Sequence, residues 1–141
     1  MPSKTVINAA KKACTKSCCE HTLGAVLYKG GGILRICCNV NKHMSYRKKY
    51  FAHGTPTRHA EMNAIHQIPR DVLEKCSLLV VRLNKKGDMK SAKPCSACAL
   101  ALYHSGIKHV YYSSYSGEIL KLNFNELIYG NYTKERYDDY H

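Results

Sequence analysis

Apolar positions in the first third of the chain predict one helix followed by a pair of strands. Residues 5–19 place apolar or small side chains three and four positions apart, with lysines largely between them, which is typical of an amphipathic helix that covers a sheet. Residues 23–28 and 33–40 are short apolar runs separated by the Lys-Gly-Gly-Gly turn at 29–32. Because glycine adopts positive φ without strain, this arrangement predicts a β-hairpin.

After residue 58 the pattern alternates between helix and strand. Helical spacing marks two segments, nearly continuous apolar runs mark two strands, and weaker patterns mark an edge strand and a last helix. The two helical segments are residues 59–67 and 95–104, and the two strands are residues 78–83 and 110–113. The edge strand is 118–122, and the last helix is 125–129. Strands separated by helices predict right-handed crossovers, and therefore an α/β fold with its functional site at one end of the central strands.

The 141-residue length suits a single domain over residues 1–141, in which the polar, tyrosine-rich segment 131–141 is a frayed or docked tail. The sequence has no signal-peptide pattern and no apolar run long enough to cross a membrane, so we expect an intracellular, cytoplasmic protein. Its eight cysteines are then expected to stay reduced. A disulfide-stapled secreted domain is thereby excluded.

Lysine and arginine exceed aspartate and glutamate by 22 to 10, which gives a net charge of +12. So strong an excess indicates an anionic substrate or partner. A nucleotide phosphate and a nucleic acid both fit this charge, because one monophosphate requires only a few cations and a polynucleotide uses many more.

Two short segments supply the ligands and the acid–base group of a catalytic zinc site. His59 lies two residues before Glu61, and Cys95 and Cys98 are spaced to lie on one face of a first helical turn. One imidazole and two thiolates leave the fourth tetrahedral position of zinc for water, and the carboxylate can move protons. As a merely structural residue Glu61 would stabilise its helix by about 1 kcal/mol at most.

The order His-Ala-Glu, followed 36 residues after the histidine by Pro-Cys-x-x-Cys, resembles the zinc-dependent cytidine/deoxycytidylate deaminase superfamily. The match in appearance is nearest to its deoxycytidylate branch, on Met62 to Ile65 and Ser105 to Lys108. The resemblance implies a three-layer α/β/α fold, with a mixed sheet of about five strands that includes an N-terminal hairpin. It also implies Zn²⁺ as cofactor and self-association into a homo-oligomer.

The resemblance further implies how the site residues act. Zinc held by His59, Cys95 and Cys98 activates a water molecule for attack on the ring carbon that carries the amine, and Glu61 transfers the protons. The backbone N–H of Ala60 would hold the pyrimidine carbonyl oxygen. Asn39, favoured over Asn41, would touch the sugar, although an asparagine at this position can equally well simply end a strand.

Two basic loops lead toward the zinc ligands. Residues 42–58 include Lys48 and Arg58, and residues 84–93 include four further lysines. We expect Lys48 and Arg58 to contact an anionic phosphate; a solvated charged loop is the alternative interpretation.

These observations lead to one principal hypothesis and two alternatives. The principal hypothesis is a zinc-dependent hydrolase that converts a cytosine nucleotide resembling dCMP into the uracil nucleotide and ammonia. The first alternative is a deaminase that acts on a base in nucleic acid, either cytosine in single-stranded DNA or RNA or adenosine in tRNA. The second is a non-catalytic, zinc-stabilised module that binds nucleic acid. A structural zinc site usually has four protein ligands, and only three are evident here, which counts against this alternative.

Overall fold

The computed structural model describes residues 1–15, 22–39, 60–130 and 132, and these form a six-stranded mixed sheet with helices on both faces. The strand order is β2-β1-β3-β5-β6, and β4 pairs with the end of β3. The strands are β1 (Thr22–Lys29), β2 (Gly32–Cys38), β3 (Ser77–Leu83), β4 (Met89–Lys90), β5 (His109–Ser113) and β6 (Ile119–Lys121). The helices are α1 (Lys4–Cys14), α3 (Ala60–Ile65), α4 (Arg70–Leu73), α5 (Ser96–Ser105) and α6 (Phe124–Ile128).

The predicted hairpin is confirmed. Strands β1 and β2 pair antiparallel from Gly24–Cys38 to Lys29–Gly32, and Gly30 takes the positive φ of 58° that the turn requires. Strand β2 ends at Cys38, within the predicted run 33–40. The hairpin places β2 at the edge of the sheet and β1 beside the central strand β3.

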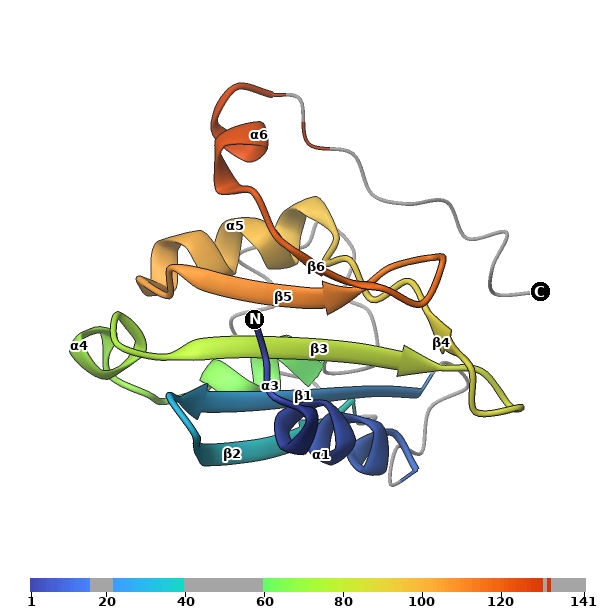
Figure 1. The fold of residues 1–141 in the computed structure, drawn as a ribbon. Coiled ribbons are helices and arrows are strands. Elements are labelled where there is room, and N and C mark those ends of the chain that lie inside the picture. The colour runs from blue at the N-terminus through green and yellow to red at the C-terminus, as the bar shows by residue number, and fades with distance from the viewer. Residues whose placement is uncertain (16–21, 40–59, 131, 133–141) are drawn as a thin grey trace.

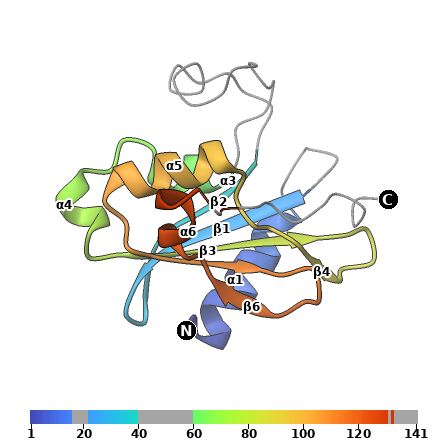
Figure 2. The same ribbon diagram turned by 90° about the horizontal axis from the view of Figure 1, so that it is seen from above.

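The alternation of side chains along β3 divides the core into two apolar layers. Leu78 and Val80 pack among residues of α3 and α5, and Leu79 and Val81 pack among residues of α1. Figure 2 shows α3 and α5 on one side of the sheet and α1 on the other. The predicted three-layer α/β/α arrangement is therefore confirmed, with both predicted zinc helices in the same layer.

Helix α1 begins where Ser3 accepts a hydrogen bond from the Val6 N–H over 3.3 Å, as an N-cap serine does. Its apolar stripe lies on the sheet, and the Cys14 thiol donates to the Val81 carbonyl over 3.3 Å. The helix ends at Cys14, earlier than the predicted 5–19, and residues 16–21 lie outside the described part of the chain.

Two short elements were not predicted from the sequence. The loop 84–93 turns around Asn84, whose side-chain oxygen accepts from the backbone N–H groups of Lys86 and Asp88, each at 2.9 Å, and then pairs β4 with β3. Helix α4 is a single turn after Pro69. Both elements are too short to show a periodic pattern in the sequence. Their conformation depends on the neighbouring segments.

The topology brings the two predicted zinc helices to the same face as crossover connections. Strands β3 and β5 are parallel and α5 connects them, while α3 lies between β2 and β3 in the chain. Helix α5 therefore begins near the end of the sheet where β3 finishes. No helix among the described residues is long and apolar enough to cross a membrane.

Candidate functional site

The predicted proton-transfer residue, Glu61, lies in the first turn of α3 with only 4% of its surface exposed. Ala60, at the start of the same helix, is completely buried. A carboxylate is seldom buried unless nearby groups interact with it.

The two cysteines lie together at the start of α5. Cys95 is the N-cap residue rather than the first helical residue, and its sulfur accepts a hydrogen bond from the Cys98 N–H over 3.5 Å. The Cys98 side chain is completely buried. A backbone N–H that donates to a sulfur favours the thiolate, which is the form that binds metal.

Glu61 and the two cysteines are close enough to influence each other's protonation. Burial is the main reason that the pKa of Cys98 is raised well above its usual value, and hydrogen bonding to Cys95 and the charge of Glu61 raise it further. These interactions bring α3 and α5 together at their N-terminal ends. The sequence predicted this meeting of Glu61, Cys95 and Cys98.

The chemistry of this donor set fits zinc. Two adjacent sulfurs, one on the partly buried Cys95 and one on the buried Cys98, repel each other when both are ionised, and a divalent ion bound by thiolates supplies the compensating charge. Within the described residues, no three His, Cys, Asp or Glu side chains are arranged to hold a metal ion. The predicted third ligand, His59, immediately precedes α3 and lies outside that part of the chain.

Asn39, predicted to contact the sugar, is buried at the end of β2. Its side-chain oxygen accepts from the Leu23 N–H over 3.0 Å, and its own N–H donates to the Leu23 carbonyl over 3.2 Å. Both bonds hold the end of the hairpin, which is the role expected of an asparagine that ends a strand. The sugar contact stays a prediction, and Lys48 and Arg58 lie outside the described residues.

The end of α3 away from Glu61 is held by Arg35 of strand β2. The Arg35 Nη1 donates to three carbonyl oxygens at this end, those of Asn63, Ala64 and His66, at 3.3, 3.4 and 2.8 Å. The Asn63 amide also donates to the Cys38 carbonyl over 3.1 Å. Arg35 is the lone charged residue in the apolar run 33–40, which was the available sequence signal, but nothing in the sequence identified its partners.

Helix α5 is held in the same manner. The Arg70 Nη1 donates to the His104 carbonyl over 2.8 Å, and Gly106 follows the helix with a φ of 93°. Each of the two helices therefore carries its candidate chemistry at the N-terminal end and an arginine contact at the C-terminal end.

Tyr132 is a residue at this site that the sequence interpretation missed. Its hydroxyl donates to the carbonyl of Pro94, the residue before Cys95. Burial raises the pKa of Tyr132 well above its usual value, and the charges of Tyr112, Cys95 and Glu61 contribute to that rise. The polar composition of the surrounding tail hid this contact.

Comparison with family models gives one match, to the cytidine and deoxycytidylate deaminase zinc-binding region, over residues 2–114. This span includes both predicted zinc segments and ends just after β5. No curated protein matches the chain at a significant level.

Solved structures with a similar fold include cytidine deaminase from Burkholderia pseudomallei, which is 22% identical with a TM-score of 0.62. That alignment covers 90% of this chain and 96% of the other. A dCMP deaminase from the cyanophage S-TIM5, in complex with dCMP and dUMP, is 18% identical with a TM-score of 0.48; its alignment covers 81% of this chain and 85% of the other. The first of these similarities confirms the predicted fold class.

Proposed function

We propose that this chain acts on a cytosine nucleotide such as deoxycytidylate. The premise is that the chain belongs to the zinc-dependent cytidine and deoxycytidylate deaminase family. The reaction replaces the exocyclic amine with oxygen: cytosine nucleotide and water give uracil nucleotide and ammonia. Family membership supports deamination in general. The choice of a mononucleotide is the proposal.

The observation that supports the deamination chemistry in this proposal is the burial of Glu61 beside Cys98. A carboxylate that only stabilised the first turn of α3 would do so equally well while exposed to solvent. Its position between two helices, in contact with a thiol that suits a metal, is the position that proton transfer next to a metal requires.

Zinc held by His59, Cys95 and Cys98 would supply a Lewis acid that lowers the pKa of a water molecule to about 7. Glu61 accepts the proton that this water loses as its oxygen bonds to the ring carbon bearing the amine. The carboxyl group then protonates the adjacent ring nitrogen. A second proton passes through Glu61 to the amine, the carbon–nitrogen bond breaks, and ammonia leaves.

Substrate orientation is assigned to four predicted residues. The Ala60 N–H would donate to the pyrimidine carbonyl oxygen, and Asn39 would contact the sugar. Lys48 and Arg58 would bind the phosphate, which the net charge of +12 supports in general terms.

Ammonia release tests the substrate class directly. The zinc-loaded protein is given dCMP and a cytosine-containing single-stranded DNA in parallel, with Glu61→Gln as blank and Glu118→Gln, which changes an exposed carboxylate, as control. We expect turnover of dCMP by the protein and by the Glu118 variant only. Turnover of the DNA alone would replace this proposal with nucleic-acid editing, and inactivity on both would require tests of adenosine in tRNA and of binding without catalysis.

The phosphate assignment has a separate test. Reversing the charge of Lys48 or Arg58 should lower kcat/KM for dCMP and leave kcat/KM for deoxycytidine unchanged, because the nucleoside lacks the phosphate. The exposed Lys75 provides the matched charge reversal. Equal losses on both substrates would remove Lys48 and Arg58 from the phosphate site.

A further inference from the structure

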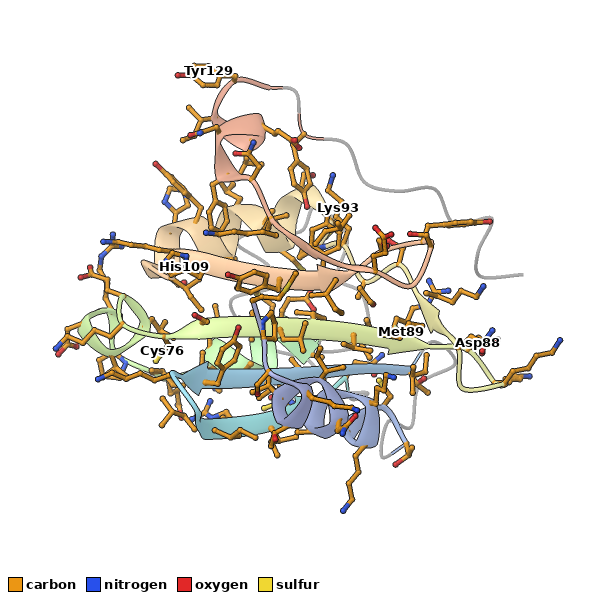
Figure 3. The ribbon with its side chains drawn as sticks, viewed as in Figure 1. Cys76, Asp88, Met89, Lys93, His109 and Tyr129 are labelled. Atoms are coloured by element: carbon orange, nitrogen blue, oxygen red, sulfur yellow. The ribbon has the colours of Figure 1, made fainter. Side chains whose placement is uncertain are left out.

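The C-terminal segment contacts the two residues that lead into Cys95. The Tyr132 hydroxyl donates to the Pro94 carbonyl oxygen. The Lys93 Nζ lies 4.7 Å from the centre of the Tyr132 ring and 3.9 Å from the Glu126 Oε2 of α6. Figure 3 shows Lys93 beside the start of α5 and below α6.

These contacts use a cation of the basic loop 84–93, which leads into Cys95. The Lys93 side chain is only 12% exposed, and its ammonium group is shared between an aromatic ring and a carboxylate. Lys93 therefore joins the segment before Cys95 to the C-terminal part of the chain.

The bond to Pro94 acts on the peptide that enters Cys95. A peptide unit is planar, so the Pro94 carbonyl oxygen and the Cys95 nitrogen lie in the same rigid plane. Holding the oxygen therefore fixes the direction in which the Cys95 backbone leaves that plane. Proline has no N–H of its own, so the carbonyl is the only backbone hydrogen-bonding group through which Pro94 can be held.

The contact comes from outside the region that defines the family. The family match ends at residue 114, whereas α6 and Tyr132 follow it. The features that identify the family therefore include Cys95 and Cys98 but not the residue that holds the entrance to them.

We propose that Tyr132 is a positioning residue for Cys95, which keeps this sulfur in place for the metal by holding the Pro94 carbonyl. The inference rests on the proposed assignment of Cys95 as a zinc ligand. Tyr132 acts through Cys95 and takes no part in proton transfer.

The test is a Tyr132→Phe variant, which keeps the ring against Lys93 and removes the hydroxyl. Both proteins are loaded with Co²⁺, and the thiolate-to-cobalt absorption and the rate of metal transfer to a chelator are recorded. Loss of one hydrogen bond predicts transfer about five- to tenfold faster and an altered cobalt spectrum. Tyr129→Phe is the matched control, because Tyr129 lies at the end of α6 with 77% of its surface exposed.

Thermal unfolding of the metal-free proteins separates positioning from general stability. A positioning role predicts that the variant lowers the midpoint more in the metal-loaded protein than in the metal-free protein, where only the hydrogen bond itself is lost. An equal fall in both states, or unchanged chelator rates and cobalt spectrum, would overturn the inference. Glu126→Gln, which weakens the hold on Lys93, should give a smaller change in the same direction.

Turnover of dCMP is measured separately on the same samples. Failure of the wild-type protein to turn over dCMP, with the difference in metal release intact, would contradict the proposed substrate and leave the role of Tyr132 standing. Metal transfer at the wild-type rate from a Tyr132→Phe variant that turns over dCMP would contradict the role of Tyr132 and leave the proposed substrate standing.

Discussion

Gly24 of β1 lies directly beneath Ala10 of α1: a Cβ built on Gly24 would be 2.2 Å from the Ala10 carbonyl oxygen. It would also be 3.0 Å from the Cβ of Ala13, which lies one turn further along α1. The helix can therefore rest on the central part of the sheet only because this position has no side chain.

Gly24→Ala should lower the free energy of unfolding by about 3 kcal/mol or slightly less, since overpacking in a filled core forces backbone shifts. Chemical denaturation measures this. Gly31→Ala is the control, because a Cβ at Gly31 meets nothing within 4 Å. Equal stability of the two variants would mean that α1 does not lie this close to β1.

Arg35→Met should destabilise the protein by about 2–3 kcal/mol, because three carbonyl oxygens at the end of α3 lose a charged donor. Denaturant titration of the metal-free protein gives the value. Arg70→Met removes the equivalent bond to α5, but the Arg70 side chain is 65% exposed, so water replaces the donor and we expect a loss of about 1 kcal/mol. A larger loss for Arg70 would contradict this ranking.

The Cys14 thiol should make the protein sensitive to alkali. Burial raises its pKa from 9.0 to about 11, so the unfolded chain ionises first as the pH rises. The stabilisation is complete below pH 9 and is lost as the pH passes through 11, amounting to about 2–3 kcal/mol. Unfolding curves between pH 8 and 11 should show this fall, and Cys14→Ala should flatten it.

Cys37→Ala serves as the comparison, since Cys37 is only half-buried. An equal pH dependence in the wild-type and Cys14→Ala proteins would assign the alkaline sensitivity to other groups.

Glu61→Gln should lower kcat by a factor of about 100 to 10,000 while zinc content stays near one per chain, because the amide cannot transfer protons. Metal analysis and single-turnover kinetics on one preparation measure both quantities. Loss of zinc along with activity would give Glu61 a structural role at the metal in place of the proposed one.

Removal of zinc by a chelator should lower the unfolding midpoint. A ligand that binds only the folded state at a free concentration 100 to 1,000 times its Kd contributes about 3–4 kcal/mol. Calorimetry with and without chelator should show this for the wild-type protein, and Cys95→Ser should respond much less. An unchanged midpoint in the wild-type protein would argue against a metal held by Cys95 and Cys98.

Periodicity and two short segments predicted the fold class, the hairpin and the meeting of Glu61 with Cys95 and Cys98. Each of these depends on local signals: the nearly continuous apolar run of β3, the glycine turn before β2, and the spacing of the cysteines. The family resemblance then supplied the three layers.

The interactions that hold the site could not be predicted in the same way. Arg35 and Tyr132 each act on backbone carbonyl groups 28 to 38 residues away in the chain, at Asn63 and Pro94. A carbonyl group has the same chemistry in every residue, so the sequence contains no sign of which one will accept. The contacts of Lys93 were equally hidden: its position in the basic segment 84–93 gave no sign that tertiary packing would place it against Tyr132 and Glu126.

The arginine contact at the far end of α3 has a mechanical consequence. Helix α3 has six residues, so it is about 9 Å long, with Arg35 at one end and Glu61 near the other. The carbonyl groups that accept from Arg35 hold the C-terminal end of this helix in place. Any tilt about that end moves the N-terminal turn, which carries Glu61, more than the C-terminal turn, so the alignment of Glu61 depends on an edge strand that carries none of the candidate zinc ligands.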